Sequence, residues 1–197
     1  MSKSQNNVDR QPVVAILGHV DHGKSTLLDY IHKTNVVDGE AGGITQSISA
    51  YEVTINGRNM TFIDTPGHEA FQHMRERGVE IADIAILVVS AEDGVKTQTL
   101  EALKAITDTS IPYIVAINKI DKPGADIERT KMNLVENGIY LEGMGGDIPF
   151  VAISAKQGTG VDDLLENILL IHDMNPKPFN AKEEATGRVL ESFVDQK

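Results

Sequence analysis

Short runs of apolar, β-branched residues alternate along the chain with segments whose apolar positions recur at the helical period. This alternation is typical of an α/β sheet that is covered by helices on both faces. The dipeptide Asn56-Gly57 is a strong signal for a two-residue hairpin, so the second and third strands are expected to pair antiparallel within a mixed sheet. The pattern predicts strands at residues 13–17, 47–55, 60–64, 84–90, 113–118 and 149–153.

The clearest predicted helix lies near the end of the chain. Its apolar residues follow the spacing i, i+3, i+4, i+7, i+8 that places them on one face. Thr159 with Asp162 has the pattern of a capping box at its start. The apolar positions are Val161, Leu164, Leu165, Ile168 and Leu169.

This helix is expected to complete a domain that spans residues 12–173. Residues 1–11 are polar and predict a disordered lead-in. Residues 174–185 contain two prolines and predict a stiff linker. Residues 186–197 alternate like a strand, and one strand cannot bury an apolar face alone, so they are interpreted as the truncated opening of a second domain. A tail that docks on the first domain is the alternative.

Length and composition narrow the class of protein. The 197 residues allow one full domain and at most a fragment of another, and 41% apolar with 24% charged residues exclude a disordered or fibrous chain. The longest apolar runs are far shorter than the ~20 residues of a membrane span. The polar N-terminus and the absence of cysteine favour a cytoplasmic protein, expected to be monomeric. The net charge of −11 disfavours loose, non-specific attraction to nucleic acid and requires any RNA contact to be local. Neither DNA nor a membrane is expected as a partner.

Residues 18–25, GHVDHGKS, directly follow the first predicted strand and fit the phosphate-loop pattern. Glycines let backbone N–H groups turn toward phosphates, and the following helix adds its positive dipole end. Lys24 would neutralise the β and γ phosphates, and the Ser25 hydroxyl would bind Mg²⁺. A metal centre at His19 and His22 is rejected, because such a loop turns these side chains away from a common point. The predicted nucleotide-binding residues are Gly18, His19, Val20, Asp21, His22, Gly23, Lys24, Ser25 and Thr26.

Two further segments are expected to respond to the γ phosphate. Residues 33–46 contain three glycines and no periodicity, which predicts a mobile loop carrying Thr45. If Thr45 closes on Mg²⁺ only when the γ phosphate is present, this loop is a nucleotide-dependent switch; an ordinary surface loop is the alternative. Gly67 would let its own N–H approach the γ phosphate. The predicted metal ligands are Ser25, Thr45 and Asp64, the last following the third strand.

A base-binding loop is predicted at residues 118–121, NKID, after the fifth strand. The Asp121 carboxylate can accept hydrogen bonds from guanine N1–H and the exocyclic amine, which adenine does not offer, so GTP is favoured over ATP. Lys119 would lie along the base, Asn118 would tie this loop to the phosphate loop, and the Ala155 N–H would reach guanine O6. The predicted base-side residues are Asn118, Lys119, Asp121, Ser154, Ala155 and Lys156.

GHVDHGKS, AGGITQ, DTPGH, NKID and SAK stand in an order that resembles translational GTPases over about residues 12–173. AGGITQSISAY, DTPGHEAF and KIDKPGAD resemble bacterial-type translation initiation factor two in particular. The resemblance implies a P-loop GTPase fold with the nucleotide at the carboxyl ends of the strands. It also implies the ribosome as partner, initiator tRNA bound only through absent domains, and residues 186–197 as the first strand of a β-barrel domain.

The resemblance also assigns roles to single residues. His68 stands where Ras-type GTPases carry a glutamine that orients the attacking water, and large-subunit ribosomal RNA would draw it into place. Val20 and Ile44 match a hydrophobic gate that holds this histidine back. Asp21 matches a residue associated with a monovalent cation. An exposed residue at a helix start is the alternative for His68.

These observations together predict a GTP-binding switch with weak hydrolysis of its own. No arginine lies within the phosphate, switch or base motifs, and Arg75 and Arg77 follow them on an ordinary helix face. Because arginine fingers contribute ~10³ to 10⁵ in rate, slow turnover without the ribosome is expected. The alternatives are a non-catalytic GTP-sensing module, a phosphate-loop kinase or ATPase, and another translational GTPase such as an elongation factor.

Overall fold

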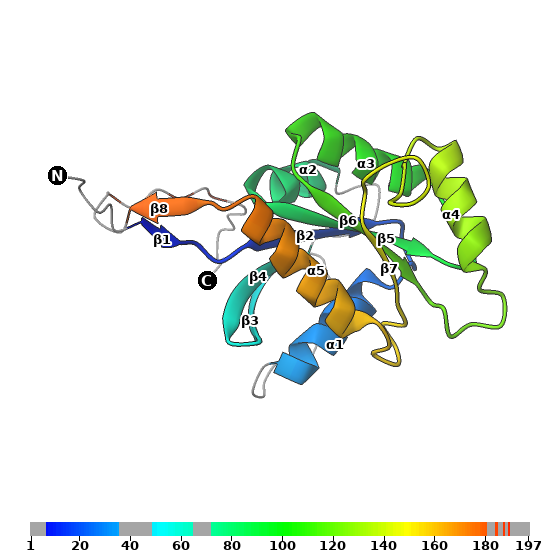
Figure 1. Ribbon diagram of the computed structural model, residues 1–197, viewed down its shortest axis with the longest axis horizontal. Helices are drawn as coiled ribbons and strands as arrows, with labels where there is room; N and C mark the ends of the chain where they lie inside the picture. The colour runs from blue at the N-terminus through cyan, green and yellow to red at the C-terminus, as the bar shows by residue number, and fades with distance from the viewer. Residues whose placement is uncertain are drawn as a thin grey trace, which may run out of the picture.

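The computed structural model describes residues 7–35, 49–64 and 72–180, with Glu184, Gly187 and Val189 beyond them. Its main sheet has six strands in the order β3-β4-β2-β5-β6-β7 (Figure 1). Strand β3 is antiparallel to β4, and all other neighbours are parallel, so the predicted mixed sheet is confirmed. The strands are β2 (Val13–Gly18), β3 (Ser49–Ile55), β4 (Arg58–Asp64), β5 (Ile84–Ser90), β6 (Tyr113–Asn118) and β7 (Phe150–Ala152).

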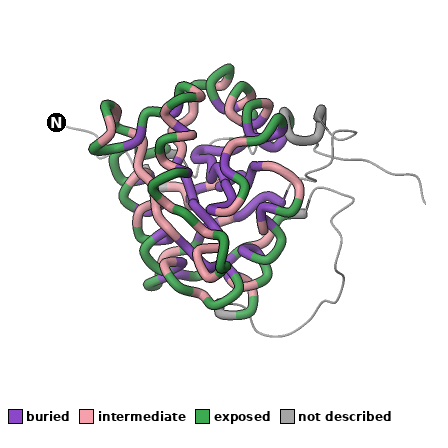
Figure 2. Tube along the Cα trace, turned by 90° about the vertical axis from the view of Figure 1, so that its right-hand side faces the viewer, coloured by how far each residue is buried: buried purple, intermediate pink, exposed green. Residues whose placement is uncertain are grey.

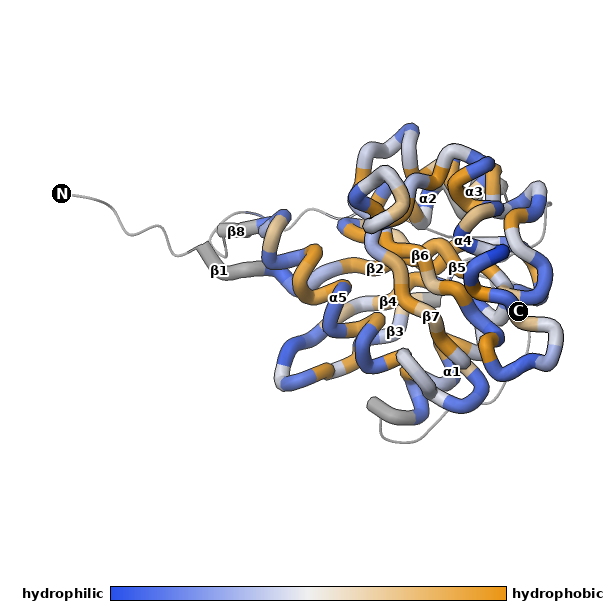
Figure 3. Tube along the Cα trace, turned by 45° about the vertical axis from the view of Figure 1, so that its right-hand side comes forward, coloured by the Kyte–Doolittle hydropathy of each residue, from blue (hydrophilic) through white to orange (hydrophobic). Residues whose placement is uncertain are grey.

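Helices cover both faces of this sheet, as predicted. Two apolar clusters flank it: α1 and α5 pack over Ile16 and Ile86, whereas α2, α3 and α4 lie on the side of Leu17 and Leu87. The buried residues form the centre of the molecule (Figure 2), and apolar residues concentrate in the sheet (Figure 3). None of the described helices is long and apolar enough to cross a membrane. The helices are α1 (Lys24–Asn35), α2 (Gln72–Ile81), α3 (Thr97–Thr109), α4 (Ile127–Glu136) and α5 (Val161–Met174).

The predicted hairpin joins β3 to β4. Ile55 pairs with Arg58, which leaves Asn56 and Gly57 as the two loop residues. Their φ angles are 51° and 76°. Two positive φ angles in succession are the requirement of a type I′ turn, which matches the twist of the flanking strands.

The start of α5 differs from the prediction. Its N-cap is Gly160, with φ 72° and no side-chain cap, so the capping box of Thr159 and Asp162 is wrong. The backbone carbonyl of Thr159 accepts a hydrogen bond from the Ser154 N–H at 2.9 Å. A Cβ on Gly160 would lie 2.5 Å from the Ala152 carbonyl oxygen. The close approach of α5 to β7 therefore favours glycine over a hydroxyl cap here.

The two ends of the domain pair with one another. Strand β1 (Asn7–Asp9) is antiparallel to β8 (Pro178–Asn180), with Val8 opposite Phe179 (Figure 1). The prediction of a disordered lead-in is therefore wrong for residues 7–9, and part of the predicted linker is a strand. Two extended segments that lie side by side can bond each other's backbone N–H and C=O groups. Because β1 and β8 are far apart in the chain, no local sequence pattern indicates that they pair. Almost all of residues 186–197 lie outside the described residues, so their assignment stays a prediction.

Candidate nucleotide-binding site

The phosphate loop connects β2 to α1 at the carboxyl end of the sheet, where the sequence places it. Two of its glycines are required by their surroundings. Gly18 has φ 143°, and a Cβ there would overlap the Val88 carbonyl. Gly23 has φ 90°, and a Cβ there would overlap the Asn118 side chain. The loop is thus folded tightly against β5 and the base loop.

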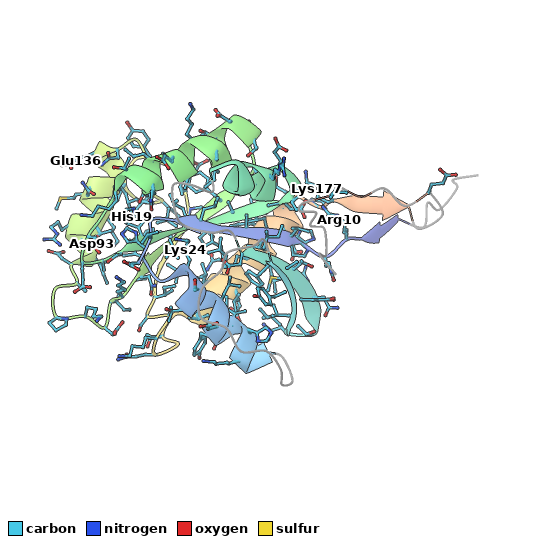
Figure 4. The ribbon with its side chains drawn as sticks, turned by 180° about the vertical axis from the view of Figure 1, so that it is seen from behind. Arg10, His19, Lys24, Asp93, Glu136 and Lys177 are labelled. Atoms are coloured by element: carbon cyan, nitrogen blue, oxygen red, sulfur yellow. The ribbon has the colours of Figure 1, made fainter. Side chains whose placement is uncertain are left out.

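Lys24, the first residue of α1, is buried, and its ammonium group turns back over the loop. Nζ donates hydrogen bonds to the carbonyl oxygens of Gly18 at 2.9 Å and His19 at 2.7 Å. Figure 4 shows His19, Lys24 and Asp93 at the same end of the molecule, away from Arg10 and Lys177. A buried cation beside a helix N-terminus fits a polyphosphate.

His22 fastens the phosphate loop to β5 as a neutral imidazole. It is 1% exposed, and its Nδ1 accepts the Ser90 N–H at 3.3 Å. Burial, followed by the proximity of His19, lowers the pKa of His22 to about 4. The two imidazole rings meet edge to face with centroids 5.0 Å apart. His22 therefore contributes no positive charge to this loop at neutral pH.

The lowered pKa predicts a pH dependence of stability. An unfolded histidine binds its proton near pH ~6.5 and the folded one near about 4. The unfolded state therefore binds more protons in this window, and the free energy of unfolding falls as the pH drops through it. We expect His22 to account for a loss of about 2 kcal/mol between roughly pH 7 and 5. Urea denaturation of His22→Asn, whose amide oxygen can replace Nδ1, should show a loss smaller by that amount; equal losses in both chains would contradict the assignment.

Asn118 joins the base loop to the phosphate loop, as predicted. It is 2% exposed, and its Nδ2 donates to the His22 carbonyl at 2.9 Å. Its Oδ1 accepts the Ala155 N–H at 3.0 Å. This differs from the prediction that the Ala155 N–H faces guanine O6. A carboxamide has an NH₂ group that donates and an oxygen that accepts, and here each of the two binds a backbone group of a different loop.

Asp121 is held in its charged form at the end of the base loop. Its Oδ1 accepts a hydrogen bond from Ser154 Oγ at 2.7 Å, and this bond lowers the pKa of the carboxyl group. A carboxylate has further lone pairs for two base donors. Ser154 therefore orients Asp121, a role that its position after a strand did not indicate. Lys119 adopts φ 66°, which turns the chain sharply between Asn118 and Asp121.

The structure describes two of the three predicted metal ligands, Ser25 and Asp64. Ser25 is exposed in the first turn of α1, and Asp64 ends β4 opposite Ile16 of β2. Hydroxyl and carboxylate oxygens are the donors that Mg²⁺ prefers, so this pair fits the ion. Thr26 is exposed on α1, and Lys156 is exposed after Ala155. The remaining predicted residues, Ile44, Thr45, Gly67 and His68, lie outside the described residues.

Sequence reasoning missed Gln98. Its side chain is 7% exposed, and Oε1 accepts the Val20 N–H at 2.8 Å. A signal was available, because Gln98 precedes Ala102 and Ile106 at the i, i+4, i+8 spacing of the buried face of α3. A polar residue on such a face requires a buried partner.

The mixed sheet, the glycine loop around Lys24 and the Asn118 bridge define a phosphate-loop nucleotide-binding domain. Residues 32–173 match the family described as the elongation factor Tu GTP binding domain. The match covers most of the chain, and the chain therefore belongs to this family of GTPase domains. The predicted P-loop GTPase fold and the binding of guanine nucleotides are thereby confirmed.

The similar proteins agree with this membership. The chain is 56% identical over 189 residues to translation initiation factor IF-2 of Syntrophomonas wolfei, and 50% identical over 194 residues to that of Clostridioides difficile. These alignments cover 96% and 98% of the chain but 21% and 30% of the relatives, so the chain spans less than a third of their length. The predicted resemblance to bacterial-type initiation factor two is confirmed.

Two solved structures show the same fold. GDP-bound aIF5B from Aeropyrum pernix superimposes with a TM-score of 0.66 at 35% identity, over 85% of this chain and 36% of that one. Elongation factor SelB from Methanococcus maripaludis, in complex with the GTP analogue GppNHp, gives a TM-score of 0.69 at 29% identity, over 86% and 35%.

Proposed function

We propose that this chain is the GTP-binding and GTP-hydrolysing switch domain of a cytoplasmic translation initiation factor. The whole factor would promote placement of initiator tRNA and joining of the ribosomal subunits, with the tRNA held by other domains. The high identity to IF-2 relatives supports the factor. The observation that carries the proposal is Asn118, whose side chain couples the loop around Lys24 to the loop that ends at Asp121.

In this proposal the two loops bind opposite ends of one GTP molecule. Lys24, the loop amides and the helix α1 N-terminus hold the phosphates, and Asp121 accepts the donors of guanine. Ser25, Asp64 and Thr45 would hold Mg²⁺, which supplies charge neutralisation at the phosphates when bound. Asp21 is the candidate for a monovalent cation.

Hydrolysis is proposed to depend on His68, which would orient the attacking water. Val20 and Ile44 would keep His68 away from the γ phosphate until large-subunit ribosomal RNA draws it in. Loss of the γ phosphate would release Thr45 and Gly67 and so change the conformation of both switch segments.

The test is single-turnover GTP hydrolysis by the full-length factor, with and without ribosomes. We expect slow hydrolysis without ribosomes and strong acceleration by the large subunit. His68→Ala should lower the accelerated rate by about 100-fold, because water is no longer positioned, while GTP affinity is unchanged. Full acceleration in His68→Ala would instead favour a non-catalytic GTP-sensing module, and fast hydrolysis without ribosomes would contradict the proposal.

A further inference from the structure

One amide of the phosphate loop is bound by a side chain from another part of the chain. The Val20 N–H donates to Oε1 of Gln98, which lies 78 residues away in the first turn of α3. Gln98 is almost fully buried, and the bond itself is partly buried. The bond therefore fixes the direction of the peptide group that precedes Val20.

The loop needs such an outside contact because its own backbone is permissive. It is bounded by Gly18 and Gly23, which both adopt positive φ and have no Cβ to restrict rotation. Between them Asp21 has φ 61°, a left-handed conformation that is unfavourable for a residue other than glycine. Such conformations persist only where surrounding contacts impose them. The Gln98 bond is attached to the residue directly before Asp21.

The segment before α3 is fixed to α4. The Val95 N–H donates to Asn133 Oδ1 at 2.8 Å, and Arg129 donates to the Glu92 carbonyl at 2.8 Å. Helix α4 follows the base loop, so these contacts connect that loop to the segment that leads into α3 and Gln98.

We propose that Gln98 is a positioning residue of the phosphate loop. By holding the Val20 amide it keeps the remaining loop amides directed toward the phosphates, and it thereby prolongs the residence of bound GDP without contacting the nucleotide. This inference rests on the proposed function, since it assumes that the loop binds guanine nucleotides.

The experiment compares three variants of this chain. Gln98→Met removes the acceptor at similar volume, and Gln98→Glu keeps an acceptor oxygen. Thr99→Val is the matched control, because it removes the neighbouring buried acceptor from the same helical turn. The measurements are the dissociation rate of a fluorescently labelled GDP and the hydrogen exchange of the Val20 amide by NMR. The wild-type Val20 amide should be protected.

We expect Gln98→Met to raise the GDP dissociation rate about tenfold and to abolish protection of the Val20 amide. Gln98→Glu should retain that protection, and Thr99→Val should retain both properties even where it lowers the melting temperature. Equal behaviour of Gln98→Met and Thr99→Val, or an unprotected wild-type Val20 amide, would overturn the inference. If wild-type chain bound no GDP, the proposed function would fail, whereas the exchange measurement would still test the Gln98 contact by itself.

Discussion

Replacing Asp121 by Asn is expected to weaken GTP and GDP binding by about 10⁴-fold. The substitution removes one of the two carboxylate oxygens that accept hydrogen bonds from guanine. An Asn carboxamide offers one acceptor and one N–H₂ donor, so it places a donor against the guanine amine. Xanthine carries a carbonyl at that position, so Asp121→Asn should prefer xanthine nucleotides. The measurement is displacement of fluorescent GDP by GTP, XTP and ATP.

The local structure makes this substitution a clean test of base recognition. Asn can keep its oxygen on Ser154 Oγ, which now donates to Asp121 Oδ1 at 2.7 Å. Asp126→Asn is the control, because Asp126 caps α4 by accepting the Arg129 N–H at 2.9 Å and lies five residues after Asp121 in the same connection between β6 and α4. It should lower stability by at most about 1 kcal/mol and leave base preference unchanged. Unchanged GTP affinity in Asp121→Asn, or competition by ATP in wild type, would favour the kinase or ATPase alternative.

The sheet could be predicted from sequence because its signals are local. All seven residues of β5 are buried, and the apolar run that reports this is continuous in the sequence. The Asn56-Gly57 turn likewise requires only two neighbouring residues with positive φ. The phosphate loop and NKID were found for the same reason, since each is a short segment placed directly after a predicted strand.

The contacts that orient Val20, Asp121 and Ala155 could not be predicted in this way, because each joins residues far apart in the chain. The Val20 to Gln98 bond spans 78 residues, and the Asp121 to Ser154 bond spans 33. Composition and periodicity do not indicate which residues far apart in the chain are in contact. The same holds for the Ala155 amide, which a strand-end pattern assigned to the base, whereas tertiary packing brings it to Asn118.

Substituting Lys24 by Met is expected to weaken GDP and GTP binding alike by about 10³-fold, equivalent to about 4 kcal/mol. The ammonium is buried in the loop and held on the Gly18 and His19 carbonyls, so it meets the phosphates with little solvent screening. Met has a similar length and apolar stem, so the loss reports the charge and its donors. Isothermal titration calorimetry of the nucleotide-free proteins with GDP measures this loss of affinity directly.

A second measurement separates lost binding from lost folding. Ligand that binds only the folded state raises stability by RT ln(1 + [L]/Kd), so GDP should stabilise wild type but barely stabilise Lys24→Met at the same concentration. Lys33→Met is the matched control, because it removes an equal charge from the exposed far end of the same helix. If only long-range attraction between lysine and the phosphates mattered, the two variants would lose similar amounts of nucleotide affinity. A large loss in Lys24→Met with near wild-type affinity in Lys33→Met would instead require direct contact between Lys24 and the phosphates, as the folded loop implies.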